Sequence, residues 1–268
     1  MAQFKDCPFI TSPQNEKVKQ WVELRKDGNV RRDRKLFFME GRRAVATALE
    51  QAPKSITDLI FTELILDDLS LVEKAGELGV PMTRVSKDVF KKVADVMEPQ
   101  GIAAVVKMPD WTLDDVLKKS DPILLVACGL QDPGNLGTLI RSCEASGATG
   151  LIALENTADP YNSKVVRSTA GTLLTLPIIR MSAGAFLKEA EKYKIRLVAA
   201  AAHEGKTHRK FDWKKRPIAL CIGSEGEGLP AEIEKAATEK VHIGVKGKAE
   251  SLNAAVAGSI LLFEAQAE

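Results

Sequence analysis

The sequence has few of the features that mark a membrane or secreted protein. None of its apolar runs approaches the roughly 20 residues of a membrane-spanning helix. The first ten residues, MAQFKDCPFI, contain neither the basic head nor the long apolar stretch of a signal peptide. Its 268 residues are 45% apolar and 28% charged. That composition is typical of an ordinary soluble protein with one or two domains.

Cysteine and histidine are scarce. They occur at Cys7, Cys128, Cys143, Cys221, His203, His208 and His242. The cysteines show no paired spacing, and two of them stand in apolar, strand-like runs, so we interpret all four as reduced thiols of a cytoplasmic protein. The histidines also lack the spacing of metal ligands. We therefore expect no disulfide and no zinc site.

The net charge is only +2, so the chain as a whole is not strongly basic. Positive charge is concentrated between Lys19 and Arg43, where nine Lys and Arg stand against four Asp and Glu. Such a run is either a solvated helix face or a patch that contacts RNA phosphates. The candidate phosphate contacts are Arg31, Arg32 and Arg34, within the segment RRDRKLFF.

The first half of the chain alternates helical and strand-like segments. The pattern predicts helices over 15–28, 42–52, 71–80 and 87–97, and strands within 35–41, 56–66, 81–86 and 101–108. We expect Gly28 to stop the first helix and Ser86 to cap the last one. Residues 1–107 are thus predicted to form a small α/β domain. Residues 108–120, with a proline near each end, are the expected linker.

The second half, residues 121–268, alternates more strictly. Strands are predicted at 123–128, 150–154, 175–179, 196–202, 218–222 and 241–245, with helices between them and a long final helix. The strands are continuous apolar runs, which are typical of a parallel sheet covered on both faces. Ligands of such sheets collect at the carboxyl ends of the strands, so the residues after each strand are the candidate site.

A glycine-rich turn, QDPGNLG, follows the first of these strands. Its glycine spacing does not match the dinucleotide-binding or phosphate-binding loops. Asn135 is expected to cap a helix that ends at Gly147 and packs on the sheet through an apolar stripe. The stripe consists of Leu136, Leu139, Ile140 and Cys143. Arg141 lies off the stripe, so it either faces solvent beside Glu144 or points toward a neighbour.

Two cations follow the second strand. Lys164 and Arg167 lie one helical turn apart and share a face, with Ser168 and Thr169 next to them. This combination is found both on solvated basic faces and at sites for the RNA backbone.

Two further turns follow later strands. In GSEGEGLPAEI, Glu225 is a carboxylate on a tight glycine loop. Gly226 and Gly228 formally match a dinucleotide fingerprint, but they lie too far from the strand and too late in the chain. In KGKAESLNAAVAG, Gly247 opens a turn, Ser251 is expected to cap the final helix, and Asn253 falls in its first turn.

Taken in order, these turns resemble the three motifs of the SpoU/TrmH family of RNA 2′-O-ribose methyltransferases, in the SPOUT class. The first motif contains Asn135, Gly137 and Arg141, and the second runs from Lys164 to Gly171. The third combines Gly223, Glu225, Gly228 and Leu229 with the later segment Glu250–Asn253. The resemblance covers roughly residues 120–268. The N-terminal half looks like the substrate-binding domain that is often fused to this family, an α/β module related to small ribosomal proteins.

The resemblance implies a C-terminal trefoil knot, a homodimer with active sites at the subunit interface, and S-adenosylmethionine held largely by backbone atoms. The corresponding cofactor-binding positions here are Gly223, Ile243, Val245, Gly247 and Leu252. One departure is Gly244-Val245, where the family usually has Pro-Met. Glycine loosens the backbone, so we expect weaker cofactor affinity.

The resemblance also assigns roles. Arg141 would be the central catalytic residue, either as the base or as a group that fixes the ribose or phosphate and stabilises the alkoxide. Asn135, Ser251 and Asn253 would orient Arg141 and the ribose, and Glu225 would brace the loop or Arg141. From the pattern of charge we expect Arg31, Arg32, Arg34, Lys164 and Arg167 to contact RNA, and the implied reaction needs no metal. Ribosomal RNA is favoured as the substrate. The alternatives are a transfer RNA methyltransferase, a non-catalytic RNA-binding knot protein, and a nicotinamide-dependent enzyme that uses Gly226 and Gly228.

Overall fold

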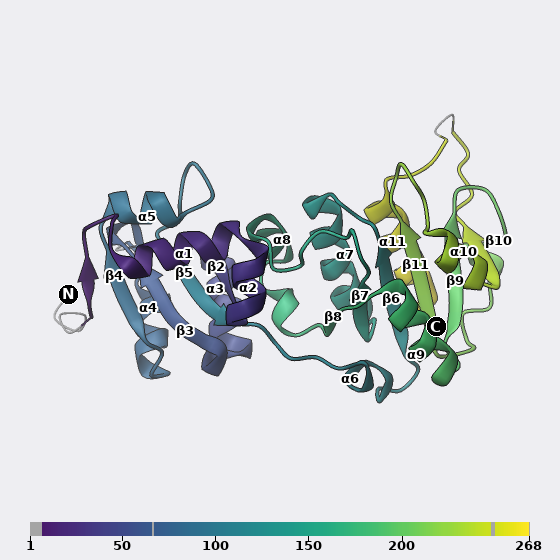
Figure 1. The fold of residues 1–268 in the computed structure, drawn as a ribbon, viewed down its shortest axis with the longest axis horizontal. Helices are drawn as coiled ribbons and strands as arrows, with labels where there is room; N and C mark the ends of the chain where they lie inside the picture. Colours follow the sequence, from purple (N-terminus) through teal and green to yellow (C-terminus); the bar gives the residue numbers. More distant parts are fainter. Residues whose placement is uncertain (1–6, 66, 248–249, 268) are drawn as a thin grey trace. The chain divides into compact units, whose positions relative to one another are not determined.

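The computed structural model describes residues 7–65, 67–247 and 250–267, and the chain divides into two compact units (Figure 1). Unit 1 comprises Met1–Pro109 and Tyr161–Leu174, and unit 2 comprises Asp110–Pro160 and Thr175–Glu268. The segment Tyr161–Leu174 comes from the middle of the second half yet belongs to unit 1. The predicted division into two consecutive domains, residues 1–107 and 121–268, placed this segment in the second domain.

Within its described residues, unit 1 has a five-stranded sheet in the order β1-β4-β3-β5-β2. The strands are β1 Phe9–Ile10, β2 Leu36–Glu40, β3 Ile56–Phe61, β4 Met82–Val85 and β5 Ile102–Lys107. The helices are α1 Glu16–Lys26, α2 Gly28–Arg34, α3 Arg42–Gln51, α4 Ser70–Glu77, α5 Lys87–Val93 and α8 Ser163–Thr169. Strand β5 runs antiparallel to β2 and β3. One face is covered by α1 and α5, whose apolar side chains form a core with Phe38, Ile60 and Val105.

The four strands and four helices predicted for the first half of the chain are confirmed, and two elements, strand β1 and helix α2, were not predicted. Helix α2 was not expected, because Gly28 was interpreted as a stop. Asp27 ends α1, and its side chain accepts a hydrogen bond from the N–H of Asn29, so it also caps the next helix. Gly28 is therefore the first residue of α2. Ser86 caps α5 as predicted, by accepting from the N–H of Val89.

Among the described residues, unit 2 has seven strands in the order β10-β12-β9-β11-β6-β7-β8, and all neighbours are parallel. The strands are β6 Ile123–Cys128, β7 Gly150–Ala153, β8 Ile178–Arg180, β9 Arg196–Ala201, β10 Lys206–Thr207, β11 Ile218–Gly223 and β12 Glu239–His242. The helices are α6 Leu113–Leu117, α7 Pro133–Ser146, α9 Ala183–Lys192, α10 Ala231–Ala236 and α11 Ala254–Ala265. The predicted parallel sheet is thus confirmed.

Helices cover both faces of this sheet, as the continuous apolar strands require. Helices α6, α9 and α10 pack on one face around the fully buried Phe186. Helices α7 and α11 pack together on the other, where a Cβ on Gly258 would lie only 2.6 Å from the Leu139 side chain. Helix α6 lies within the stretch expected to be a linker, and its Leu113 and Val116 belong to the core of unit 2. No helix of the described residues is long and apolar enough to cross a membrane. The implied knot stays a prediction.

Candidate active site

The carboxyl ends of neighbouring strands in unit 2 surround a cavity of about 300 Å³. Its walls come from the ends of β9 and β11, the segment after β12, and the first turns of α11. Four of the five residues predicted to hold the cofactor line it: Gly223, Ile243, Val245 and Leu252. Gly247 is not part of the lining. Glu225 and Ser251 also contribute to the walls.

The loop after β11 forms the tightest part of this wall. The backbones of Ser224 and Gly228 exchange two hydrogen bonds of 3.0 and 3.1 Å across it. A Cβ on Gly223 would lie 2.3 Å from the carbonyl carbon of Gly228, so only glycine fits there. Gly228 has a φ of +69°, which also favours glycine. Gly223 and Gly228 therefore serve the loop geometry, and Gly228 is also one of the two glycines that formally match a dinucleotide fingerprint.

Three predicted site residues from distant parts of the chain meet in one cluster. Oε1 of Glu225 accepts hydrogen bonds from Nδ2 of Asn253 at 2.6 Å and from Nδ2 of Asn135 at 3.3 Å. Asn253 also donates to Oδ1 of Asn135 over 3.0 Å. Ser251 lines the cavity but has no hydrogen-bond partner among the residues that the structure describes. A single carboxylate thus holds the two amides in fixed orientations.

Both helix caps differ from the sequence prediction. The cap of α7 is Asp132, whose side chain accepts from the N–H of Asn135 over 2.8 Å. Pro133 follows it at the first helical position, where a backbone N–H would have no partner within the helix, so proline is tolerated there. The side chain of Asn135 is therefore released from capping and can reach Glu225. The cap of α11 is Asn253 rather than Ser251, because its Oδ1 accepts from the N–H groups of Ala255 and Val256, the second and third residues of the helix.

Arg141 stands apart from this cluster. The predicted apolar stripe of α7 is fully buried, and Arg141 lies off it, exposed to solvent. In the part of the chain that the structure describes, it has no hydrogen-bond or ion-pair partner, so the expected pairing with Glu144 is absent. It lines neither the cavity described above nor a second cavity of about 250 Å³ beside it. That second cavity shares Ser224 and Glu225 with the first and is also lined by Asn135.

The basic patch predicted between Lys19 and Arg43 is only partly exposed. Arg31 is 2% exposed, and its Nη1 donates to the carbonyl oxygens of Leu24 at 2.8 Å and Arg25 at 3.0 Å. These are the last carbonyls of α1, so Arg31 stabilises a helix end and is not available to RNA. Arg32 and Arg34 remain exposed.

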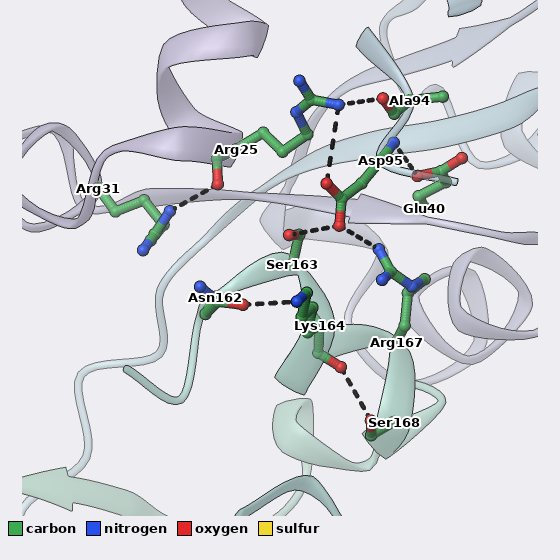
Figure 2. A network of polar contacts seen from close by, with 10 residues as sticks. All are labelled: Arg25, Arg31, Glu40, Ala94, Asp95, Asn162, Ser163, Lys164, Arg167 and Ser168. Carbon is green, nitrogen blue, oxygen red and sulfur yellow. Dashed lines mark hydrogen bonds and ion pairs between the residues drawn. The ribbon is translucent and has the colours of Figure 1, made fainter. Parts of the chain in front are cut away.

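The second motif lies on α8, in unit 1. Nη1 of Arg167 lies 2.6 Å from Oδ2 of Asp95, and Ser163 donates to the same oxygen over 2.9 Å (Figure 2). Burial alone would raise the pKa of Asp95, but the hydrogen bonds from Arg167 and Ser163 outweigh burial and lower it. Lys164 is exposed, and its ammonium has no partner within the described residues. Sequence reasoning missed Asp95, because it belongs to none of the motifs.

Comparison with known proteins agrees with this arrangement. Residues 122–263 match the SpoU rRNA Methylase family, and residues 15–104 match the MRM3-like substrate binding domain. The 23S rRNA (guanosine(2553)-2'-O)-methyltransferase RlmP of Bacillus subtilis is 31% identical over 95% of this chain and 97% of its own length.

Two solved structures are similar along nearly the whole chain. The AdoMet-bound rRNA methyltransferase from Sinorhizobium meliloti has a TM-score of 0.85 and 29% identity, and the match covers 97% of both chains. The SpoU methyltransferase AviRb from Streptomyces viridochromogenes, in complex with AdoMet, has a TM-score of 0.82 and 32% identity. That match covers 94% of this chain and 97% of AviRb. Because the family match spans more than half of the chain and contains all three motifs, the protein belongs to the SpoU rRNA methylase family.

Proposed function

We propose that the protein transfers a methyl group from S-adenosylmethionine to a ribose 2′-hydroxyl of ribosomal RNA. The observation that carries the proposal is the cluster of Asn135, Glu225 and Asn253 beside the cavity, in a chain of the SpoU family. Relatives named as 23S rRNA 2′-O-methyltransferases favour ribosomal over transfer RNA.

The cavity suits a small-molecule cofactor. Its volume of about 300 Å³ lies at the lower end of the range for ligand sites, about 300–1,000 Å³. Gly223 brings bare backbone to the wall, and Ile243 and Leu252 supply apolar surface, so main-chain contacts of these residues would hold the cofactor. When bound, S-adenosylmethionine supplies a methyl group activated by a sulfonium.

The protein's main task is then orientation, which can lower a barrier by about 7–11 kcal/mol. Glu225 fixes the amides of Asn135 and Asn253, and these amides would position the acceptor ribose. A guanidinium is in general a poor base, so we do not assign proton removal to Arg141. We assign it the electrostatic stabilisation of the developing alkoxide or of an adjacent phosphate.

A homodimer would complete the site. Arg141 lies outside both cavities of its own chain, and α11 exposes Val256, Ile260 and Phe263 at a spacing that puts them on one face. A second copy covering this face would bury these side chains. Light scattering at micromolar concentration should give twice the chain mass of 29.1 kDa, and a monomer mass would contradict the dimer. A cytoplasmic location remains our expectation.

The function can be tested in cells. Ribosomal RNA from a strain that lacks the gene should lose one ribose methylation. The wild-type gene should restore it, and a gene encoding Arg141→Ala should not. An unchanged 2′-O-methylation map in the deletion strain would contradict the proposal.

A further inference from the structure

We propose that Asp95 is a positioning residue for the substrate: it anchors helix α8 through Arg167 and Ser163, so that Lys164 is presented to a phosphate of the RNA. This inference rests on the proposed function. It changes the role of Arg167 from an RNA contact to an internal anchor.

The anchor is a carboxylate held from several directions (Figure 2). Oδ2 of Asp95 accepts from Arg167 at 2.6 Å and from Ser163 at 2.9 Å, and Nη1 of Arg25 lies 3.9 Å from its other oxygen. The backbone N–H of Asp95 donates to Oε2 of the buried Glu40 over 2.9 Å. Both ends of the residue are therefore fixed, and so is the side of α8 that it contacts.

Two further contacts attach the same segment to unit 1. The hydroxyl of Thr47 on α3 donates to the carbonyl of Ala170, at the end of α8, over 3.1 Å. Gly171 follows with a φ of +96°, and a Cβ there would lie 2.6 Å from Cβ of Thr47. At the other end, the rings of Phe37 and Tyr161 have centroids 5.0 Å apart.

Gly171 of the second motif thus allows the chain to approach Thr47 of α3 closely. Residues 161–174 are built onto unit 1, although they lie within the stretch that matches the methylase family. The chain enters this segment from β7 and leaves it toward β8, two strands of the catalytic sheet.

Anchoring leaves specific cations free. The side chain of Arg167 is only 29% exposed, and its charge is neutralised by Asp95. Lys164 precedes it by one turn, and its exposed ammonium has no partner among the described residues. On the adjoining α3, Arg43 lies one turn before Thr47, and its guanidinium likewise has no partner within the described chain. Unneutralised cations on two joined helices fit the phosphates of an RNA backbone.

The test uses the full-length protein and ribosomal RNA from a strain that lacks the gene. Asp95→Asn should raise the KM for RNA about 10-fold, since hydrogen bonds to a charged group are lost. The kcat and the affinity for S-adenosylmethionine should stay within about twofold, because both depend on residues of unit 2. Asp95→Glu should recover most of the RNA affinity. Arg167→Gln should match Asp95→Asn, and the double variant should be no worse than either.

Exposed residues elsewhere provide matched controls: Asp88→Asn on α5 for the carboxylate and Lys188→Ala on α9 for the lysine. Lys164→Ala should lower the log–log salt slope of RNA binding by about one, and Lys188→Ala should not. An Asp95→Asn KM equal to that of Asp88→Asn, or equal slopes for the two lysine variants, would overturn the proposal.

Hydrogen exchange separates this proposal from the proposed function, because it needs no activity. The amides of residues 163–169 should exchange faster in Asp95→Asn than in Asp88→Asn. If the wild-type protein transferred no methyl group, the proposed function would fail, while exchange and the salt slope would still decide whether Asp95 anchors α8. Equal exchange in the two variants would refute the anchor.

Discussion

Oε1 of Glu225 lies 2.6 Å from the side-chain nitrogen of Asn253 and accepts its hydrogen bond. The same oxygen also accepts from Asn135 and from the N–H of Ala254. One acceptor atom therefore joins the loop after β11 to the first turns of α7 and α11. Two amides that we assign to the acceptor ribose depend on it for their orientation.

Replacing Glu225 by alanine should lower kcat by about 10- to 100-fold, because both amides lose a charged hydrogen-bond partner. Glu225→Gln keeps one acceptor and should be less severe. Glu232→Ala, an exposed carboxylate on α10, is the matched control. Steady-state kinetics at saturating cofactor measures the difference. Equal kcat values for Glu225→Ala and the control would remove Glu225 from the site.

Alanine substitution should be harmful at one glycine of the loop after β11 and tolerated at another. Gly223→Ala places a methyl group against the backbone of Gly228, so we expect a lower Tm and at least about a 10-fold loss of cofactor affinity. Gly226→Ala should be tolerated, since a Cβ there has no atom within 4 Å and the φ is not positive. Calorimetric titration with S-adenosylmethionine distinguishes the two variants. Normal affinity in Gly223→Ala would show that this wall does not hold the cofactor.

Gly244→Pro should strengthen cofactor binding by a few-fold. Gly244 follows β12 between two cavity-lining residues, a Cβ there has open space, and its N–H makes no backbone hydrogen bond among those described. Proline would stiffen the segment before binding and so reduce the entropic cost. Gly247→Pro, just beyond the lining, is the comparison. Weaker binding in Gly244→Pro would mean that the cofactor needs this flexibility.

The arginines of α2 should separate into two roles. Arg31→Ala should lower the free energy of unfolding by about 1–3 kcal/mol, because carbonyls at the end of α1 lose their donor. The double variant Arg32→Glu, Arg34→Glu should leave stability nearly unchanged and reduce the salt slope of RNA binding by about two. Thermal melts and RNA binding at several salt concentrations measure both. An unchanged slope in the double variant would exclude this patch from RNA binding.

The buried Asp58 predicts a pH dependence. Burial raises its pKa above 3.8, and the hydrogen bond from Thr83 and the charge of Lys17 only partly offset this effect. A raised pKa means that ionisation of Asp58 opposes folding. The stability contributed by its protonated carboxyl is therefore fully present below pH 3.8 and is lost as the pH rises through the folded pKa. Asp58→Asn should therefore raise Tm at pH 7, and the gain should vanish below pH 3.8.

The exposed Asp68 should show the opposite sign. Hydrogen bonds from Ser70 lower its pKa, so its ionised form favours folding and Asp68→Asn should lower Tm at pH 7. Melting curves of both variants from pH 3 to 7 make the comparison. The same sign for both variants at pH 7 would contradict this account.

The parallel sheet and the stripe of α7 could be predicted, because continuous apolar strands and an i, i+3, i+4, i+7 pattern each have one common structural meaning. The helix caps were assigned to the wrong residues. Asp132 and Asn135, or Ser251 and Asn253, are equally good caps by type, so residue type alone does not decide between them. Glu225 contacts the residue that does not cap α7, Asn135, but in α11 it contacts the cap itself, Asn253.

Contacts between distant segments left no local signal. Arg31 has the same sequence context as its exposed neighbours, but it reaches the end of α1 and becomes buried. Asp95 is a single acidic residue outside every motif, and its partner Arg167 lies 72 positions further along the chain. The attachment of residues 161–174 to unit 1 depends on such contacts, so periodicity could not reveal it.

The most direct test of the central claim is the position of the transferred methyl group. Purified protein is incubated with methyl-labelled S-adenosylmethionine and ribosomal RNA from a strain that lacks the gene, and the RNA is digested to nucleosides. We predict that the label appears in one 2′-O-methylribose and that Arg141→Ala lowers the rate by at least about 100-fold without changing cofactor affinity. Label on a base, or a normal rate in Arg141→Ala, would contradict the account.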